Sequence, residues 1–271
     1  MEFVTIQGMP QERAETGQGP GAGRGVDVPL IPAWGEVYAR YYDLIHKDHP
    51  YGVISKKLGE VRRNRFGQRG IKVLELGCGT GVLTYFLKHQ LYNGSQLVGG
   101  DPSEAMLARA RSLYPGMQWV DAEFPYGENA GVFDLVVASF NVLNYVPTYL
   151  ALTGWLCKAR AFVGKGGCLV FDAMDGEAIL RNGMEKLYRQ IDSIGKPHYM
   201  ARLKMVPWIE GQDAVLRYNI EIFKERISVD HFRTNHKVRG HTTAERVSAA
   251  NGAGFPYVRI EDWGPTRFYM A

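Results

Sequence analysis

The stretch VLELGCGTG, residues 73–81, joins the pattern of a buried strand to a turn with glycine at every second position. Glycines 77, 79 and 81 let the backbone fold tightly and approach a ligand closely. A helical pattern follows over 80–91, and the positive end of that helix would point at the same ligand. The stretch therefore predicts the first strand, turn and helix of a ligand-binding α/β sheet.

Apolar strand patterns alternate with helical patterns from residue 71 to about residue 175. We predict strands at 71–76, 96–101, 117–122, 133–140 and 166–173, and helices at 80–91, 102–114 and 146–163. This alternation requires right-handed crossovers and gives a parallel sheet with helices on both faces. The predicted fold class is α/β, with a doubly wound, mostly parallel, Rossmann-like sheet.

The segments around this core have other patterns. Residues 1–30 are rich in glycine and predict a flexible tail, and 31–66 contain two predicted helices, at 33–46 and 51–65. After the core (67–175), residues 176–240 predict an antiparallel β insertion that follows the fifth strand. In VLRYNIEIF, residues 215–223, apolar and polar side chains alternate as in a half-buried strand. Residues 241–271 predict a closing helix, with Thr242 or Thr243 as its N-cap, and a last strand at 257–263.

Composition argues against several classes of protein. The 32 Lys and Arg residues against 28 Asp and Glu residues give a net charge of only +4, so we predict no nucleic-acid partner. The three cysteines fit neither a disulfide framework nor a zinc site, and the histidines at 231–241 have no metal-ligand spacing, so we predict no metal. No apolar run is long enough for a membrane span, and the first residues have no signal-peptide core. We expect a cytoplasmic protein.

The glycine pattern distinguishes between two kinds of nucleotide ligand. A dinucleotide fingerprint needs a third glycine at position 82, where this chain has Val. The pattern is instead Glu75-x-Gly-x-Gly-x-Gly, with an acidic residue inside the strand. Residues 73–81 resemble the first motif of class I S-adenosylmethionine-dependent methyltransferases. The resemblance implies that S-adenosyl-L-methionine is the cofactor, and that its binding residues include Glu75, Gly77, Cys78, Gly79 and Gly81.

Further residues agree with this family. Asp101 ends the second strand, where a carboxylate can accept both ribose hydroxyls, and Ser103 is available to cap the next helix in its place. By resemblance, Asp121 and Ala122 would hold the adenine. The alternative for Asp121 is a surface aspartate in a loop. The remaining cofactor-binding candidates are Pro102, Met106 and Phe140, and Met106 is as readily a core methionine.

Two segments carry the candidates for catalysis. The family's loop after the fourth strand faces the sulfonium and the substrate, so Asn141 and Tyr145 are predicted catalytic residues and Asn144 a substrate contact. The tyrosine-rich residues 38–43 resemble the lid helix of small-molecule N-methyltransferases, which include amino-sugar dimethyltransferases and glycine and sarcosine methyltransferases. In that family a tyrosine of this helix reaches the cofactor or the acceptor. Tyr42 is the first choice and is a predicted catalytic residue, and Tyr38 is the second choice and a predicted cofactor contact. The alternative is aromatic packing of the helix.

The insertion also resembles the amino-sugar group, in which it forms a wall of the acceptor pocket and often a dimer contact. The resemblance therefore allows a homodimer. Those enzymes can carry a histidine where this chain has Tyr145, and a neutral tyrosine orients an acceptor better than it removes a proton. Arg217 and His241 are candidates for binding an acidic acceptor, with solvent-exposed strand residues as the alternative.

These observations predict S-adenosylmethionine-dependent methyl transfer to a small-molecule acceptor, with an amine nitrogen favoured over oxygen. In-line displacement of this kind depends on alignment and on the exclusion of water. One alternative is a small-molecule O-methyltransferase of secondary metabolism. Another is a non-catalytic cofactor-binding scaffold, which the intact glycine turn and Asp101 disfavour.

Overall fold

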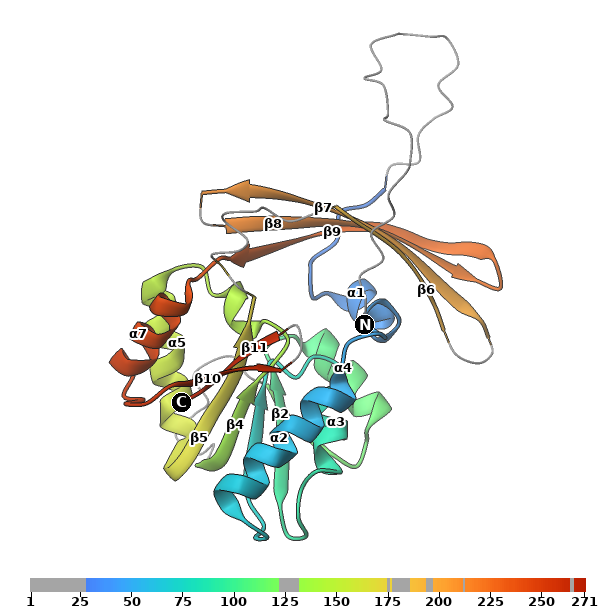
Figure 1. The fold of residues 1–271 in the computed structure, drawn as a ribbon. Coiled ribbons are helices and arrows are strands. Elements are labelled where there is room, and N and C mark those ends of the chain that lie inside the picture. The colour runs from blue at the N-terminus through green and yellow to red at the C-terminus, as the bar shows by residue number, and fades with distance from the viewer. Residues whose placement is uncertain are drawn as a thin grey trace, which may run out of the picture.

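The computed structural model describes residues 28–121, 132–174, 176, 186–193, 197–211, 213–263 and 266–271. These residues form a seven-stranded sheet with helices and a four-stranded antiparallel sheet (Figure 1). The predicted fold class and the antiparallel insertion after the fifth strand are confirmed. Most of the predicted tail, residues 1–27, lies outside the described residues.

Five adjacent strands of the seven-stranded sheet are parallel. They are β1 (Lys72–Leu76), β2 (Gln96–Asp101), β3 (Gln118–Asp121), β4 (Phe133–Ala138) and β5 (Val163–Ala173). The sheet order is β10-β11-β5-β4-β1-β2-β3. The chain therefore proceeds outward from β1 to β3 on one side and from β4 to β5 on the other. Ligands of doubly wound sheets bind at the carboxyl ends of the strands at such a reversal, which here lies between β1 and β4.

Helices cover both faces of this sheet. The helices α2 (Tyr51–Phe66) and α3 (Val82–Lys88) pack on one face through a buried cluster that includes Leu58, Leu83 and Val73. The helices α5 (Tyr149–Phe162) and α7 (Thr243–Gly252) pack on the other face. The helix α4 (Glu104–Leu113) contacts β2 and β3. Of the two predicted N-caps of α7, Thr242 is the one that caps the helix, and it does so in a capping box with Glu245.

The closing hairpin contains one strand more than the sequence predicts. The predicted last strand is β10 (Arg259–Trp263), and a further strand, β11 (Thr266–Met270), pairs antiparallel with it. β11 also pairs antiparallel with β5, so it lies between β5 and β10 in the sheet. The late hairpin therefore extends the parallel sheet beyond β5.

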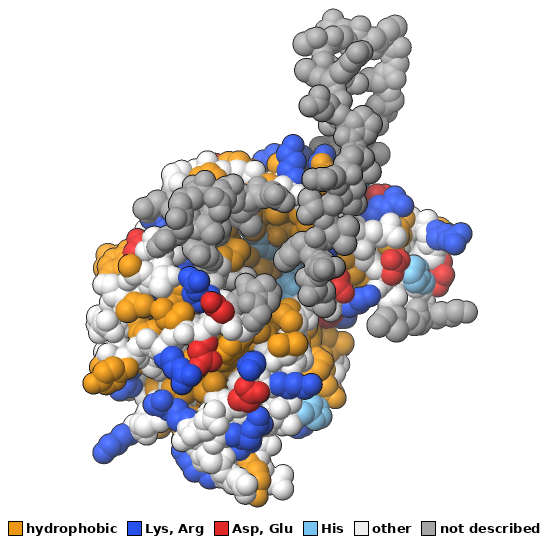
Figure 2. Space-filling view, in the orientation of Figure 1, with side chains coloured by type: hydrophobic (Ala, Val, Ile, Leu, Met, Phe, Trp, Pro, Cys, Tyr) orange, Lys and Arg blue, Asp and Glu red, His pale blue; other side chains and the backbone are white. Residues whose placement is uncertain are grey.

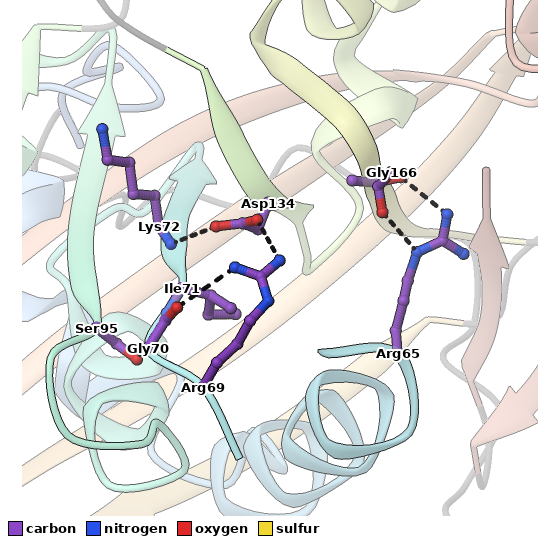
Figure 3. A network of polar contacts seen from close by, with 9 residues as sticks. Arg65, Arg69, Gly70, Ile71, Lys72, Ser95, Asp134 and Gly166 are labelled. Atoms are coloured by element: carbon purple, nitrogen blue, oxygen red, sulfur yellow. Dashed lines mark hydrogen bonds and ion pairs between the residues drawn. The ribbon is translucent and has the colours of Figure 1, made fainter. Parts of the chain in front are cut away.

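A polar network fixes the end of the core opposite the carboxyl ends of the strands (Figure 3). Arg69 donates to Asp134 Oδ1 at 2.7 Å, and the backbone N–H of Lys72 donates to Asp134 Oδ2 at 2.8 Å. Arg65 of α2 donates to the backbone carbonyls of Gly166 and Gly167. These contacts connect α2 and the approach to β1 with β4 and β5.

The four-stranded sheet consists of β6 (Leu187–Asp192), β7 (Tyr199–Glu210), β8 (Asp213–Lys224) and β9 (Ile227–Arg239). The buried side chains Ile220, Ile222 and Phe232 pack against α1 (Glu36–Ile45). Figure 1 shows α1 between this sheet and the upper end of the core. The residues before α1 extend along β9, because Ile31 N–H donates to the Arg233 carbonyl and Arg233 N–H donates to the Pro29 carbonyl. The alternation in the late sequence thus produces the sheet that supports α1.

The described surface has mixed charge. Figure 2 shows Lys and Arg side chains interspersed with Asp and Glu side chains on one face. Among the described residues, no helix is long and apolar enough to cross a membrane. The mixed charge on this face agrees with the small net charge of the chain.

Candidate active site

A cavity of about 170 Å³ opens at the carboxyl ends of β1, β2 and β4, beneath α1. This is the position expected from the reversal of strand order. Its lining comes from the glycine turn, the end of β2, the loop after β4 and the residues around α1. The lining residues are Trp34, Tyr42, Tyr51, Glu75, Gly77, Cys78, Gly79, Thr80, Val82, Leu83, Asp101, Pro102, Ser103, Met106, Ser139, Phe140, Val142 and Tyr145.

The glycine turn needs its glycines for two reasons. Gly77, Gly79 and Gly81 have φ values of 72°, 55° and 83°, a left-handed region that residues with a Cβ adopt at a cost. A Cβ on Gly77 would also lie 2.5 Å from a methyl carbon of Val142, and one on Gly81 would overlap the ring of Trp119. Gly81 does not line the cavity, and it lets the turn pack against Trp119.

Asp101 connects the end of β2 with the glycine turn. Its Oδ2 accepts from Gly79 N–H at 2.8 Å, and its Oδ1 accepts from Ser103 N–H at 2.9 Å. Ser103, and not Asp101, caps α4 by accepting from Met106 N–H. Burial raises the pKa of Asp101, while its two backbone hydrogen bonds act in the opposite direction. Because each carboxylate oxygen can accept a second hydrogen bond, Asp101 can also accept from a ligand.

Glu75 is the second carboxyl group in the cavity wall. It is 2% exposed, and its Oε2 accepts from the Thr84 hydroxyl. Burial raises the pKa of Glu75 to about 8. Glu75 is therefore mainly protonated at neutral pH.

Aromatic side chains form the part of the cavity wall nearest α1 and the loop after β4. Trp34 lies edge-on to Tyr145, with ring centroids 5.2 Å apart, and it also contacts Tyr42. The pKa values of Tyr42, Tyr51 and Tyr145 are raised well above the ordinary value for tyrosine, mainly by burial. These three hydroxyls therefore stay neutral. No Lys, Arg or His is among the described residues that line the cavity.

The loop after β4 has a constrained backbone. Phe140 and Asn141 have φ values of 63° and 66°, which are unfavourable for residues with a Cβ. The Asn141 N–H donates to the buried carboxylate of Asp172 at 2.7 Å, and burial raises the pKa of Asp172 to about 6. Asp172 thus holds the turn that leads to η1 (Val142–Tyr145). The sequence analysis missed it because Asp172 lies within an apolar strand pattern.

Several predicted site residues lie outside the cavity lining. Asn144 is buried and supports the loop, because its amide donates to the Arg239 carbonyl and accepts from Met174 N–H. The buried His241 is hydrogen-bonded through Nε2 to the Val146 carbonyl. Arg217 is exposed, and its guanidinium lies 4.7 Å from the ring centroid of Trp208.

The remaining candidates lie next to the cavity. Tyr38 is buried and hydrogen-bonded to His46 Nε2 at 2.9 Å. Asn141 contributes its backbone N–H to Asp172, as described above. Asp121 lies beside Asp101 in the β2–β3 register, and Ala122 is outside the described residues.

The structure also adds residues that the sequence analysis did not select. Trp34, Tyr51, Thr80 and Ser139 line the cavity, and the buried Ser139 hydroxyl has no hydrogen-bond partner among the described residues. Trp34 and Tyr51 reach the cavity because the fold places residues 31–66 next to the glycine turn. Neither residue stands out in the helical or strand pattern of the sequence.

A family model agrees with this site. Residues 73–167 match the model described as a methyltransferase domain. The segment 73–167 therefore has the sequence of a methyltransferase domain. The matched segment begins in β1, includes the glycine turn and Asp101, and ends within β5.

Curated relatives resemble part of the chain. A trans-aconitate 2-methyltransferase of Methylobacterium nodulans is 30% identical over 173 residues, which are 63% of each protein. A carboxy-S-adenosyl-L-methionine synthase of Sulfurimonas denitrificans is 33% identical over 112 residues, or 41% of this chain and 46% of the relative. Each alignment thus spans less than two thirds of the relative's length.

Solved structures resemble the fold over most of the chain. Streptomyces venezuelae DesVI has a TM-score of 0.72 at 19% identity, covering 86% of this chain and 97% of the other. The sugar N-methyltransferase KedS8 of Streptoalloteichus has a TM-score of 0.70 at 16% identity, with coverages of 95% and 98%. CalS10, an amino pentose methyltransferase of Micromonospora echinaspora, has a TM-score of 0.66 at 17% identity, with coverages of 88% and 97%. At these identities the similarity establishes a shared fold.

Proposed function

We propose that this chain transfers the methyl group of S-adenosyl-L-methionine to the amine nitrogen of a small molecule. The observation that carries the proposal is an aromatic cavity wall without a described cation, beside a glycine turn and the carboxyl group of Asp101. The glycine turn and Asp101 suit the donor, and the aromatic wall suits an amine.

The residues present fit the donor. Asp101 can accept further hydrogen bonds from the ribose hydroxyls, and Met106 and Phe140 offer apolar surfaces to the adenine. Ser139 offers a hydroxyl that has no partner among the described residues. Asp121, beside Asp101, would hold the adenine amino group. When bound, the sulfonium supplies a methyl group that needs no further activation.

The character of the wall favours an amine over a carboxylate. Aromatic faces attract cations such as an ammonium product. A carboxylate placed among Trp34, Tyr42 and Tyr145 would lose its hydration without gaining a described cation as partner, and such burial is costly. The solved structures described as sugar and amino pentose methyltransferases support the same choice, so we take an amino sugar as the acceptor class.

Methyl transfer would depend mainly on positioning. The lone pair of the neutral amine attacks the methyl carbon, the carbon–sulfur bond breaks, and its electron pair stays on sulfur. Tyr42 and Tyr145 would orient the amine by hydrogen bonds, and residues 31–66 would act as a lid that excludes water. The new ammonium then loses its proton to water after release.

Mass spectrometry of reaction products tests the proposal. The purified protein is incubated with S-adenosylmethionine and one of three acceptors in separate reactions. The acceptors are an amino hexose, the same hexose with a hydroxyl in place of the amine, and trans-aconitate. We expect methylation of the amino hexose alone, and Asp101→Ala, which removes the proposed ribose contact, should abolish it. Methylation of the hydroxyl analogue or of trans-aconitate, with no methylated amine, would overturn the assignment to nitrogen.

A further inference from the structure

Tyr145, in the cavity wall, is hydrogen-bonded to a histidine behind it. The Tyr145 oxygen lies 3.1 Å from Nδ1 of His236, which belongs to β9. His236 is only 3% exposed and does not line the cavity, whereas Tyr145 is 37% exposed and does. The other ring nitrogen of His236, Nε2, is buried without a hydrogen-bond partner among the described residues.

The ring of His236 is surrounded by aromatic side chains. Its ring lies at 90° to Trp34 with centroids 4.8 Å apart, and at 79° to Tyr218 with centroids 5.3 Å apart. Tyr38 is a third aromatic neighbour, at 5.2 Å. Aromatic faces are negative, so they tolerate an N–H group better than a nitrogen lone pair. Because Nε2 is buried among these rings and has no polar partner among the described residues, we take the tautomer with hydrogen on Nε2 and a lone pair on Nδ1 as part of the proposal below.

This tautomer fixes the direction of the hydrogen bond. A neutral Tyr145 has one proton to donate, and the lone pair of His236 Nδ1 must receive it. The Tyr145 oxygen then offers only lone pairs to a molecule in the cavity. An acceptor molecule that brings an N–H group can bind to it, whereas a carboxylate oxygen cannot.

We propose that His236 is a positioning residue that holds the Tyr145 hydroxyl as a donor to Nδ1 and so makes Tyr145 favour a methyl acceptor that brings a hydrogen-bond donor, such as an amine, over a carboxylate. The proposal deepens the proposed function and rests on it. The pair moves no proton during methyl transfer, and its task is to keep the amine lone pair directed at the methyl group.

The charge state of the pair agrees with this role. Burial lowers the pKa of His236 to about 4 and is the main cause that raises the pKa of Tyr145. The titratable groups around His236 are Tyr38, Tyr145, Tyr218 and the nearby His46, and burial favours the neutral form of each of them. The direction of the hydrogen bond is therefore constant across neutral pH.

Nuclear magnetic resonance of the full chain labelled with ¹⁵N-histidine tests the tautomer without any acceptor. We expect His236 to show a protonated Nε2 and an unprotonated Nδ1 at pH 7, with and without S-adenosylhomocysteine. His236→Asn identifies the signals by their loss. Protonated Nδ1, or a doubly protonated ring, would overturn the proposal.

Binding of two small probes tests the selection. Cyclohexylamine and cyclohexanecarboxylate are titrated into the S-adenosylhomocysteine complex, and their dissociation constants are measured by ligand-observed magnetic resonance. His236→Phe should weaken cyclohexylamine about tenfold relative to cyclohexanecarboxylate, since a freed Tyr145 hydroxyl can donate to the carboxylate. Tyr145→Phe should weaken cyclohexylamine similarly, and the double variant should lose no more.

The conservative variant separates positioning from packing. His236→Asn places an amide oxygen near the position of Nδ1, so it should keep most of the preference for cyclohexylamine. An unchanged preference in His236→Phe, with unchanged affinity for S-adenosylhomocysteine, would overturn the proposal. If His236→Phe does not fold, the tautomer and His236→Asn decide the question. Because no step involves turnover, a protein with this tautomer that methylates no amine would refute only the proposed function.

Discussion

Replacing Glu75 by Gln tests the electrostatics of the cavity most directly. Glu75 is 2% exposed, its ordinary pKa is 4.5, and burial raises that pKa to about 8. The unfolded chain loses the proton near pH 4.5, and the folded chain keeps it to about pH 8. Glu75 therefore has no cost below pH 4.5, a cost that grows as the pH rises from 4.5 to 8, and a constant cost above pH 8.

The size of this cost follows from the two pKa values. The full difference corresponds to roughly 5 kcal/mol, of which about 3 kcal/mol is present at pH 7. Glutamine has the same shape and no charge, and its amide can keep the hydrogen bond to Thr84. Glu75→Gln should therefore raise the free energy of unfolding at pH 7 by up to about 3 kcal/mol and the melting temperature by several degrees.

Denaturant unfolding at several pH values measures this effect. The advantage of Glu75→Gln over the wild type should grow by about 3 kcal/mol between pH 5 and pH 7.5. Asp134→Asn is the matched control of opposite sign, because the backbone N–H of Lys72 and the Arg69 side chain lower the pKa of Asp134. That variant should be less stable than the wild type at pH 7. A stability difference between Glu75→Gln and the wild type that does not change with pH would refute the reasoning.

Two further substitutions test the turn and the lid. Asp43→Asn weakens the contact of α1 with the hydroxyl of Thr80. S-adenosylhomocysteine should therefore dissociate several-fold faster in stopped-flow measurements. An unchanged dissociation rate would contradict the proposal that residues 31–66 act as a lid. Gly81→Ala should lose about 1–3 kcal/mol more stability than Gly94→Ala in denaturant unfolding, since both glycines have positive φ and only Gly81 packs against Trp119. Equal losses would show that backbone strain alone determines the cost.

The sequence predicts the core of the fold because the signals there are local. The strands of the core are short runs, and helical periods follow the first, second and fourth of them, so a parallel sheet with helices on both faces can be predicted from local patterns. The glycine turn and Asp101 could be selected in the same way, since they stand at strand ends. The strand β11 was missed, since it is a five-residue strand whose place beside β5 depends on the sheet.

The acceptor side of the cavity could not be predicted equally well. Tyr42 and Tyr145 were selected by resemblance, and both line the cavity. Trp34 and His236 lie far apart in the chain and meet only because β9 brings one sheet face over α1. His236 falls within an ordinary alternating strand, so its sequence context indicates burial and nothing about its hydrogen bond to Tyr145. The homodimer stays a prediction that light scattering can test.

The sequence similarity covers the residues that fit the methyl donor better than those around the methyl acceptor. The matched domain, residues 73–167, contains the glycine turn and Asp101, which are the groups that fit the donor. Trp34 and Tyr42, which form much of the aromatic wall, lie outside that segment, as does His236 behind the wall. Similarity to a trans-aconitate methyltransferase thus need not extend to the acceptor, and a neutral wall has no described cation for a carboxylate. The chemistry of the wall, and not the name of a relative, should decide which acceptor is tested first.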